Sequence, residues 1–505
     1  MSAGATIAVG LISHTNAGKT TLARTLLRRD IGEVGDRAHV TEVAERHVLV
    51  ESPQGDVLAL WDTPGFGDSM RLFSRLSQNQ NPVSWVLTQV WDRLTDRPFW
   101  SSQQAIRSAR EQCDVVLYVV NASEAPEEAR YIGPEMKILE WVGKPVLLLL
   151  NQLGAPRSQA RVDADVALWR SYLAAHGCIR GVLSLDAFAR CWVQEDTLLA
   201  RVQGILQPEL QPAGERLRAA WLARNLEVFD RSMRVVARLL ATIASDEEPV
   251  SPASVQQKIR GWVSSVATGV DTPDSELERA QRALAERLEA TRRAAIDELI
   301  ELHGLSGKAA SEQLQALAHE LGVERPADEH KASLLGGLLS GAAGGLAADL
   351  AAGGLTFGAG ALLGAVVGAL GARSITQLYN VASGRETGRI WWSHEFLTRR
   401  VATSLLAYLA IAHFGRGRGE FVLGAVPDHW QQAIGRLARH RVALEAAWEG
   451  ARADKDFAAT EAALLGVVTV LTRDVLLALY PDSAGSVLPI SKPQAQLREA
   501  PTGER

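Results

Sequence analysis

Short apolar runs of strand length recur through the first 205 residues of the chain, and amphipathic stretches separate them. The runs cover residues 6–12, 57–61, 115–120, 146–150 and 181–185. Two of the intervening stretches, TTLARTLLRR and EEARYIGPEMKILEWV, carry apolar residues at helical spacing. Short buried runs that alternate with helices predict βαβ units around a mostly parallel sheet. We therefore expect an α/β domain over residues 1–206.

The pattern changes after residue 206, where the regular alternation of strand-length runs stops. The segment 207–214, QPELQPAG, has the proline and glycine content of a linker. Helical spacing then dominates residues 215–480, and its longest stripe comprises Leu277, Ala280, Leu284, Leu288, Ala295 and Leu299. We expect an all-helical domain over 215–480, followed by a mostly disordered tail over 481–505.

One segment of the helical region, residues 334–371, consists largely of glycine, alanine and leucine and carries a single charge, Asp349. Gly360, Gly364 and Gly368 lie four residues apart, which places them on one helix face and allows close helix packing. Two interpretations stay open: a hairpin that inserts into a membrane, and a tightly packed hairpin inside a soluble helical domain. The low hydrophobicity of glycine and alanine favours the second. We expect no other segment to span a membrane.

Composition narrows the class of protein. A chain of 505 residues predicts two or three domains, and 47% hydrophobic residues are enough for a large core. The formal net charge of -5 gives no electrostatic case for a general nucleic-acid binder. Three cysteines without a CxxC spacing fit a reducing compartment. The first residues lack a basic n-region and a cleavage site, so we expect no signal peptide and a cytoplasmic protein, with the inner face of the membrane as an alternative site.

The stretch SHTNAGKTT, residues 13–21, lies between the first apolar run and the first amphipathic stretch. A loop with GKT between a strand and a helix is the context of a phosphate-binding loop. Its backbone N–H groups are expected to surround phosphate, Lys19 to reach the β- and γ-phosphates, and Thr20 to ligate Mg²⁺. Ser13 replaces the usual first glycine of such a loop. A small polar residue can often take this backbone position, so the replacement does not exclude a phosphate-binding loop. The predicted nucleotide-binding residues of this loop are Asn16, Ala17, Gly18, Lys19, Thr20 and Thr21.

A second motif, WDTPGFGD at residues 61–68, ends the second apolar run. An aspartate at a strand end supplies a carboxylate to Mg²⁺, and a glycine three residues later supplies an N–H to the γ-phosphate. Asp62 and Gly65 occupy these two positions. Together, NxGKT and DTPG resemble the P-loop G-domain of the group that contains Era, TrmE, EngA and the septins.

The resemblance implies a fold, a ligand and residue roles. It implies that GTP or GDP binds with Mg²⁺, and that Thr41 is the switch I threonine and a further Mg²⁺ ligand. Lys19, Thr41 and Gly65 are then the residues that act on the transferred phosphoryl group. An ordinary loop threonine remains the alternative for Thr41.

The base-reading motif departs from the family pattern. Where the family has NKxD, this chain has NQLG, so Asn151 is in place but Gln152 replaces the lysine and Gly154 replaces the aspartate. The aspartate of the family pattern accepts hydrogen bonds from both guanine N–H groups, and such a polar match supplies strong discrimination of guanine from adenine. Ser184, in LSLDAF, has the position of the serine in the family's SAK loop. The resemblance favours GTP, with ATP or relaxed use of bases as the alternative.

The residue after Gly65 is Phe66, where Ras-like enzymes have a glutamine that orients the attacking water. Phenylalanine cannot orient water, so we expect slow hydrolysis. Some relatives in this group dimerise through their G-domains and recruit K⁺, and the resemblance makes Asn16 the candidate K⁺ ligand. The alternative is that Asn16 only braces the loop through its own backbone.

Residues 69–112 form an insertion that follows the DTPG motif directly. Its apolar residues recur at helical spacing: Val83, Val86, Leu87, Val90 and Leu94. Two interpretations stay open for this helical insertion. It either caps the sheet, or reports the state of the nucleotide to a protein effector.

The whole arrangement resembles a bacterial family with a G-domain followed by a helical region, number 3482 in the series of domains of unknown function. We expect a GTP-binding protein that acts as a slow GTPase and nucleotide-dependent switch. One alternative is a scaffold with negligible hydrolysis. The other is an RNA- or ribosome-associated GTPase, which the arginine cluster RLARHR at 436–441 keeps open. The expected partners are guanine nucleotide, a second G-domain, a protein effector and, through 334–371, a membrane.

Overall fold

The computed structural model describes residues 4–14, 17–29, 44–88, 96–151, 159–185, 191–250, 276–305, 375–378, 388–414, 427–453 and 456–488. The chain divides into two compact units. The first comprises Met1–Val228, Ala412–Glu420 and Thr472–Arg505. The second comprises Phe229–Ile411 and Phe421–Leu471.

A six-stranded sheet in the order β2-β3-β1-β4-β5-β6 forms the centre of the first unit. All neighbours pair in parallel except β2 with β3. Each of the five apolar runs predicted from the sequence is one of the parallel strands. The bounds are β1 Thr6–Ser13, β2 Glu45–Glu51, β3 Val57–Asp62, β4 Val115–Asn121, β5 Val146–Asn151 and β6 Ile179–Ser184. The edge strand β2 was not predicted, because its sequence ERHVLVE is half charged and half exposed.

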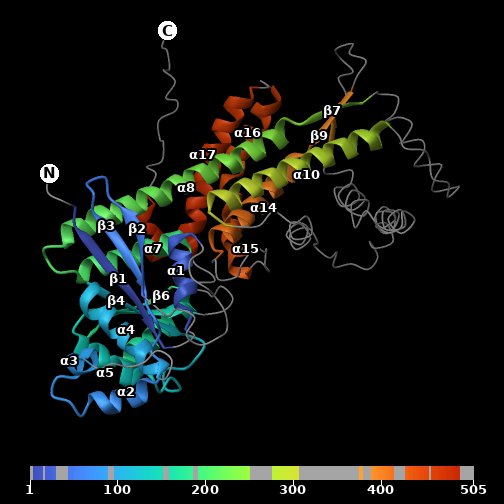
Figure 1. Ribbon diagram of the computed structural model, residues 1–505. Helices are drawn as coiled ribbons and strands as arrows, with labels where there is room; N and C mark the ends of the chain where they lie inside the picture. The colour runs from blue at the N-terminus through green and yellow to red at the C-terminus, as the bar shows by residue number, and fades with distance from the viewer. Residues whose placement is uncertain are drawn as a thin grey trace, which may run out of the picture. The chain divides into compact units, whose positions relative to one another are not determined.

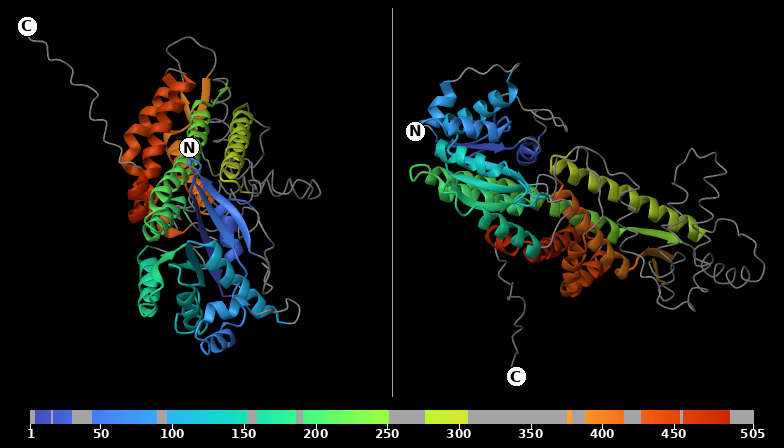
Figure 2. Two further views of the ribbon diagram at one scale, coloured as in Figure 1. Left: turned by 60° about the vertical axis from the view of Figure 1, so that its left-hand side comes forward. Right: turned by 90° about the horizontal axis from the view of Figure 1, so that it is seen from below.

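Helices cover both faces of this sheet and make it the middle of three layers (Figures 1 and 2). One core joins the sheet to α1, α7 and the beginning of α8, and the other joins it to α2–α6. The bounds are α1 Lys19–Leu27, α2 Ser69–Leu76, α3 Pro82–Thr88, α4 Arg97–Gln112, α5 Ile132–Val142, α6 Gln159–Tyr172, α7 Trp192–Ile205 and α8 Gln211–Ser245. The predicted P-loop G-domain, with its mostly parallel sheet, is therefore confirmed.

Two boundaries differ from those expected. Helix α8 begins at Gln211, so the second half of the segment 207–214 forms its first turn rather than a linker. The segment expected to be a disordered tail begins with helix α18, Pro481–Val487. This helix packs against α7, and Thr197 Oγ1 donates to Ser483 Oγ at 3.0 Å. A helix of seven residues draws its stability from such packing, which a sequence pattern does not reveal.

The second unit is mostly helical. Besides the end of α8 it contains α10 Glu276–Leu302, α14 His394–Ala412, α15 Asp428–Ile434, the 3₁₀ helix η3 Gly435–His440, α16 Arg441–Ala453 and α17 Phe457–Leu479. It also holds a three-stranded antiparallel sheet in the order β7-β9-β8, so the expectation of a purely helical region was wrong in this detail. Its strands are β7 Glu247–Val250, β8 Ile375–Leu378 and β9 Gly388–Trp392. These strands have only four or five residues, which is too short for a recognisable alternation of apolar and polar residues in the sequence.

Helix α17 bears on the expectation that no segment other than 334–371 spans a membrane. Among the described residues it is the one helix with the length and composition to cross a membrane, with a mean hydropathy of 2.0 over its most apolar window. Of that window, 39% is buried inside the protein, and core helices of soluble proteins pass the same test. The predicted hairpin at 334–371 lies outside the described residues.

Candidate nucleotide-binding site

The predicted phosphate loop joins the end of β1 to the start of α1. Gly18 is the N-cap of α1 and has φ 84° and ψ 27°, a left-handed conformation that glycine adopts without strain. Ser13 instead belongs to β1, pairs with Val119 of β4 and is fully buried. The backbone at the position of the usual first glycine therefore has an extended conformation in this chain. Serine adopts that conformation without strain, which explains why it is accepted there.

Lys19 and Thr20 form the first turn of α1 and face Asp62 at the end of β3. Thr20 Oγ1 donates a hydrogen bond to Asp62 Oδ2 at 2.8 Å. The other carboxylate oxygen, Asp62 Oδ1, is buried and accepts no hydrogen bond from the part of the chain that the structure describes. A buried carboxylate oxygen beside a threonine hydroxyl is a donor set that suits Mg²⁺. The residues present therefore fit this ion.

Burial shifts the pKa values of the two charged groups in this site. It lowers the pKa of Lys19, although the nearby carboxylates of Asp62 and Glu135 act in the opposite direction. It raises the pKa of Asp62, although Lys19 and the hydrogen bond from Thr20 oppose this. Negative phosphates would stabilise the Lys19 ammonium, and a dication would stabilise the Asp62 carboxylate. A bound phosphate would therefore raise the pKa of Lys19, and a bound metal ion would lower the pKa of Asp62, each opposite to the effect of burial.

Asn151 connects the predicted base-reading segment to the phosphate loop. It ends β5, its side chain is fully buried, and its Nδ2 donates to the backbone oxygen of Ala17 at 2.8 Å. Thr21 is buried in the first turn of α1, and Ser184 ends β6. The structure thus brings Ala17, Gly18, Lys19, Thr20, Thr21, Asp62 and Asn151 to one edge of the sheet, where Ser184 ends the adjoining strand. Asn16, Thr41, Gln152 and Gly154 lie outside the described residues.

The segment after Asp62 is fixed between β1 and the insertion. Gly65 is buried, and Phe66 donates its backbone N–H to the Ser13 oxygen at 2.9 Å. The Phe66 side chain is completely buried in the core that includes α2 and α4. Phe66 therefore lies where it cannot orient water.

The insertion contacts this segment through α4. The Gly67 N–H donates to Ser102 Oγ at 3.1 Å, and a Cβ at Gly67 would lie 2.6 Å from the Cα of Pro98. The guanidinium groups of Arg71 and Arg75 lie over the Phe99 ring at 4.3 and 4.6 Å from its centroid. The insertion therefore packs directly on the segment that follows Asp62.

The structure adds a buried carboxylate that the sequence analysis missed, Glu135 on α5. It is fully buried, and Oε1 lies 2.7 Å from His14 Nδ1 while Oε2 accepts a hydrogen bond from the Tyr118 hydroxyl. Burial and the adjacent Glu135 raise the pKa of Tyr118 well above its usual range, so this hydroxyl stays protonated. One signal was available in the sequence, since Glu135 lies on the apolar face that Ile132 and Leu139 define.

Glu135 holds the second residue of the phosphate loop in place. His14 stacks on the Tyr131 ring at 4.1 Å between centroids and 15° between planes. Its backbone forms a bridge to Phe66. His14 is thus constrained by α5 through its side chain and by the DTPG segment through its backbone. These contacts fix the beginning of the loop.

Family models match most of the chain. The model described as "Domain of unknown function (DUF3482)" matches residues 173–463, which is more than half of the chain. The model described as "50S ribosome-binding GTPase" matches residues 8–152. A GTPase domain implies that guanine nucleotide and Mg²⁺ bind, and both matches confirm the resemblance drawn from the motifs.

Solved structures with a similar fold include two of Era. One is a variant of the Aquifex aeolicus protein bound to GDP·AlF4⁻, with 17% identity, TM-score 0.30 and coverage of 40% of this chain and 57% of that one. The other contains MgGDPNP and a segment of 16S ribosomal RNA, with 18% identity, TM-score 0.30 and coverage of 46% and 67%. A bacterial selenocysteine-specific elongation factor is 13% identical over 42% of this chain and 28% of its own, with TM-score 0.23. The chain spans little more than half of the first structure. A search of the curated proteins found no match.

The contact between His14 and Glu135 gives a prediction about ligand release. His14→Leu removes the donor to Glu135, and a hydrogen bond to a charged group contributes about 1.5–3 kcal/mol. We expect release of a fluorescent GDP analogue to become roughly tenfold faster, measured by stopped flow. His14→Asn is the matched control, because its amide can still donate to Glu135, and it should release GDP at nearly the wild-type rate. Equal rates for the two variants would show that this hydrogen bond does not hold the loop.

Proposed function

The chain belongs to the DUF3482 family, and from that premise we propose that it is a nucleotide-dependent switch that hydrolyses GTP slowly and signals through its helical domain. The observation that supports this most is the group formed by buried Lys19, buried Asp62 and half-buried Thr20 at the end of β1 and β3. This group has the chemistry of a phosphate and Mg²⁺ site but little solvent to stabilise its charges.

Within this proposal each residue has a distinct role. Lys19 binds the β- and γ-phosphates, while Thr20 and Asp62 are the residues that would hold Mg²⁺. Gly65 donates its backbone N–H to the γ-phosphate, and Thr41 completes the switch. When bound, Mg²⁺ neutralises charge on the phosphate oxygens. Asn151 orients the loop through Ala17, and base contacts fall to Gln152 and Ser184.

Slow hydrolysis follows from the position of Phe66. Its side chain is buried in the core, so the attacking water has no glutamine to orient it. Signalling through the insertion follows from the contact of Gly67 with Ser102, since a γ-phosphate that draws Gly65 inward would act on the same segment. The alternative to a slow GTPase is a scaffold that binds nucleotide without hydrolysing it.

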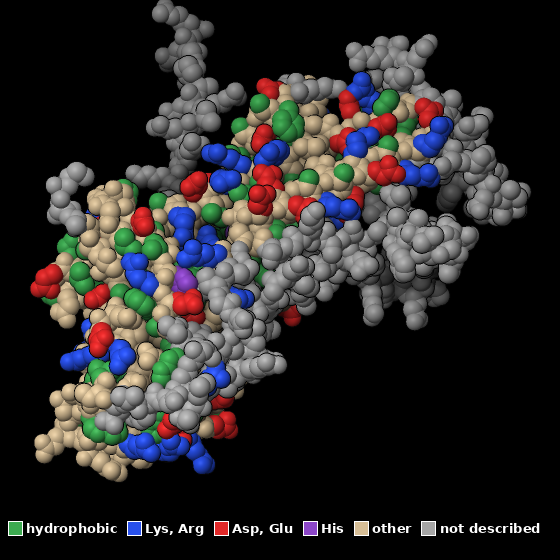
Figure 3. Space-filling view, viewed as in Figure 1, with side chains coloured by type: hydrophobic (Ala, Val, Ile, Leu, Met, Phe, Trp, Pro, Cys, Tyr) green, Lys and Arg blue, Asp and Glu red, His purple; other side chains and the backbone are tan. Residues whose placement is uncertain are grey.

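A second candidate function is RNA or ribosome association. The description of the matched GTPase model as ribosome-binding favours it. The charge of the chain is against it, because acidic and basic side chains are interspersed over the face seen in Figure 3 rather than gathered into a basic field. The remaining proposed partners are a second G-domain, a protein effector and a membrane contacted through 334–371.

Substitution of the loop lysine tests the proposed nucleotide site. Lys19→Ala removes the positive charge expected to contact the β- and γ-phosphates. We expect binding of GTP and GDP in the presence of Mg²⁺ to be lost at micromolar protein, measured by equilibrium fluorescence. Arg24→Ala removes a positive charge from the last turn of the same helix and should leave binding intact. Tight binding by the Lys19→Ala protein would contradict the assignment of the phosphate loop.

A change of monovalent cation tests the proposed route to hydrolysis. If Asn16 holds K⁺ beside the transferred phosphate, the ion takes the place of an arginine finger, a role worth roughly 10³–10⁵ in rate. We expect GTP hydrolysis to rise when K⁺ replaces Na⁺ at constant ionic strength, and to rise further with protein concentration. Asn16→Ala should remove the K⁺ effect while nucleotide affinity stays nearly unchanged. Equal rates in Na⁺ and K⁺ over a wide range of protein concentration would support the scaffold instead.

A further inference from the structure

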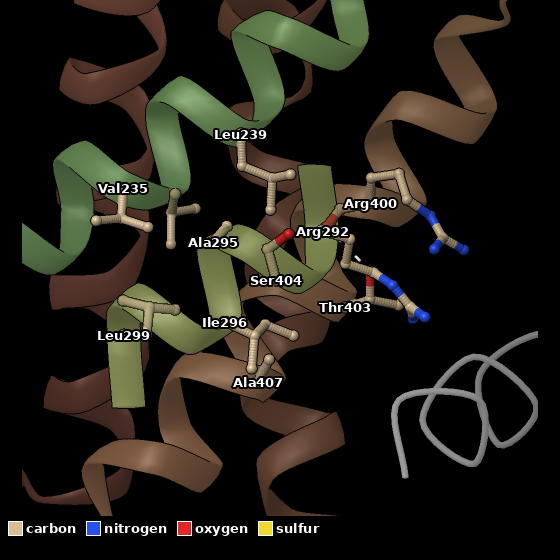
Figure 4. A pocket seen from close by; sticks show the side chains of 11 residues that line it. Val235, Leu239, Arg292, Ala295, Ile296, Leu299, Arg400, Thr403, Ser404 and Ala407 are labelled. Atoms are coloured by element: carbon tan, nitrogen blue, oxygen red, sulfur yellow. Dashed lines mark hydrogen bonds between the residues drawn. The ribbon is translucent and has the colours of Figure 1, made fainter. Parts of the chain in front are cut away.

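The second unit contains a cleft that the nucleotide site does not use. It lies between the end of α8, the second half of α10 and the middle of α14, and its volume of about 450 Å³ includes space that is open to solvent. Val235 and Leu239 of α8, Leu299 of α10 and Ala407 of α14 line it with apolar surface. Two arginines complete its rim, Arg292 from α10 and Arg400 from α14 (Figure 4).

The two arginines lie next to each other but differ in their partners. Figure 4 shows their guanidinium groups pointing the same way, away from the apolar side chains of the cleft. Arg292 Nη2 forms an ion pair with Glu289 Oε2 at 2.6 Å. Arg400 Nε is buried and has no hydrogen-bond partner among the described residues, and its guanidinium lies over the Phe396 ring at 4.8 Å. Arg400 thus has an aromatic contact where Arg292 has a carboxylate.

Among the described residues, the carboxylates near Arg400 form ion pairs with other arginines. Glu289 is shared between Arg292 and Arg293, and Glu395 pairs with Arg399. Burial, with Arg292 and Arg399 nearby, lowers the pKa of Arg400 to about 10, and only Glu289 opposes this. The guanidinium therefore remains charged at neutral pH. A buried N–H of a charged group that lacks a hydrogen-bond partner lowers the stability of the folded protein, and such a group often marks the position of a missing ion.

We propose that Arg292 and Arg400 bind a phosphate-class oxyanion at the mouth of this cleft, separate from the nucleotide phosphates. Two adjacent guanidinium groups present several N–H donors in planes that match the oxygens of a phosphate. The anion would supply the hydrogen-bond acceptor that the Arg400 Nε lacks among the described residues. Its source is either a soluble phosphate compound or the headgroup of a lipid whose apolar part meets the cleft wall.

The experiment uses the full chain carrying Lys19→Ala, so that phosphate cannot act through the nucleotide loop. Thermal unfolding is measured with and without inorganic phosphate, at constant ionic strength set with chloride. We expect phosphate well above its Kd to raise Tm by about 2–4 °C. Adding Arg400→Leu should abolish this rise. Adding Arg399→Gln, which removes the neighbouring exposed charge on the same helix, should leave it unchanged.

A second arm distinguishes the two sources. Vesicles of phosphatidylcholine alone are compared with vesicles that also contain phosphatidic acid, and bound protein is measured by sedimentation. Binding that needs phosphatidic acid and Arg400, with no response to inorganic phosphate, assigns a lipid headgroup. A response to inorganic phosphate that depends on Arg400 assigns a soluble compound.

Stability without any ligand separates a binding role from a structural one. Arg400→Leu removes a buried charge that Arg292 repels, so its Tm should equal or exceed that of the parent. Arg400→Gln gives the same comparison with a polar side chain if the leucine variant fails to fold. A fall in Tm for both variants would overturn the proposal. It would also be overturned if the responses to phosphate and to phosphatidic acid were the same with Arg400 as without it.

Discussion

The nucleotide site depends on a single juxtaposition, the meeting of the ends of two parallel strands. Because β1 and β3 are neighbours with Leu11 opposite Asp62, the helix that follows β1 begins beside that carboxylate. The hydrogen bond from Thr20 to Asp62 closes this contact, and Lys19 becomes buried between Asp62 and Glu135. Ligands bind at the carboxyl ends of parallel strands for this topological reason, so a shift in the β1–β3 register would remove the site.

Support for the loop comes from contacts that differ from the usual motif. Ser13 continues β1, His14 is held by Glu135, and Asn151 holds the oxygen of Ala17. These three contacts come from β4, α5 and β5, which lie more than 90 residues after the loop in the sequence. They fix the phosphate loop independently of the missing first glycine. The same loop is linked by Phe66 to the DTPG segment, and through Gly67 to α4, which gives the insertion a direct contact with this segment.

The sequence predicted what local patterns encode. The five parallel strands were visible as apolar runs. Lys19, Thr20 and Asp62 were visible as motifs at strand ends, and the structure brings these three residues together. Strand β2, helix α18 and the small sheet of the second unit were missed because they are short or polar and gain stability from packing. Glu135 and Arg400 were not assigned because their roles arise from burial and from partners distant in sequence. All base-reading roles, that of Asn151 included, stay predictions.

Calorimetric titration of the purified chain with GDP, GTP and ATP in the presence of Mg²⁺ tests the central claim most directly. The account predicts one site per chain, binding that depends on Mg²⁺ for GTP, and tighter binding of GDP and GTP than of ATP. Because Gly154 replaces the aspartate that reads guanine, the preference over ATP should be smaller than in GTPases with the complete motif. No measurable heat with any of the three nucleotides at protein concentrations well above micromolar would contradict the account.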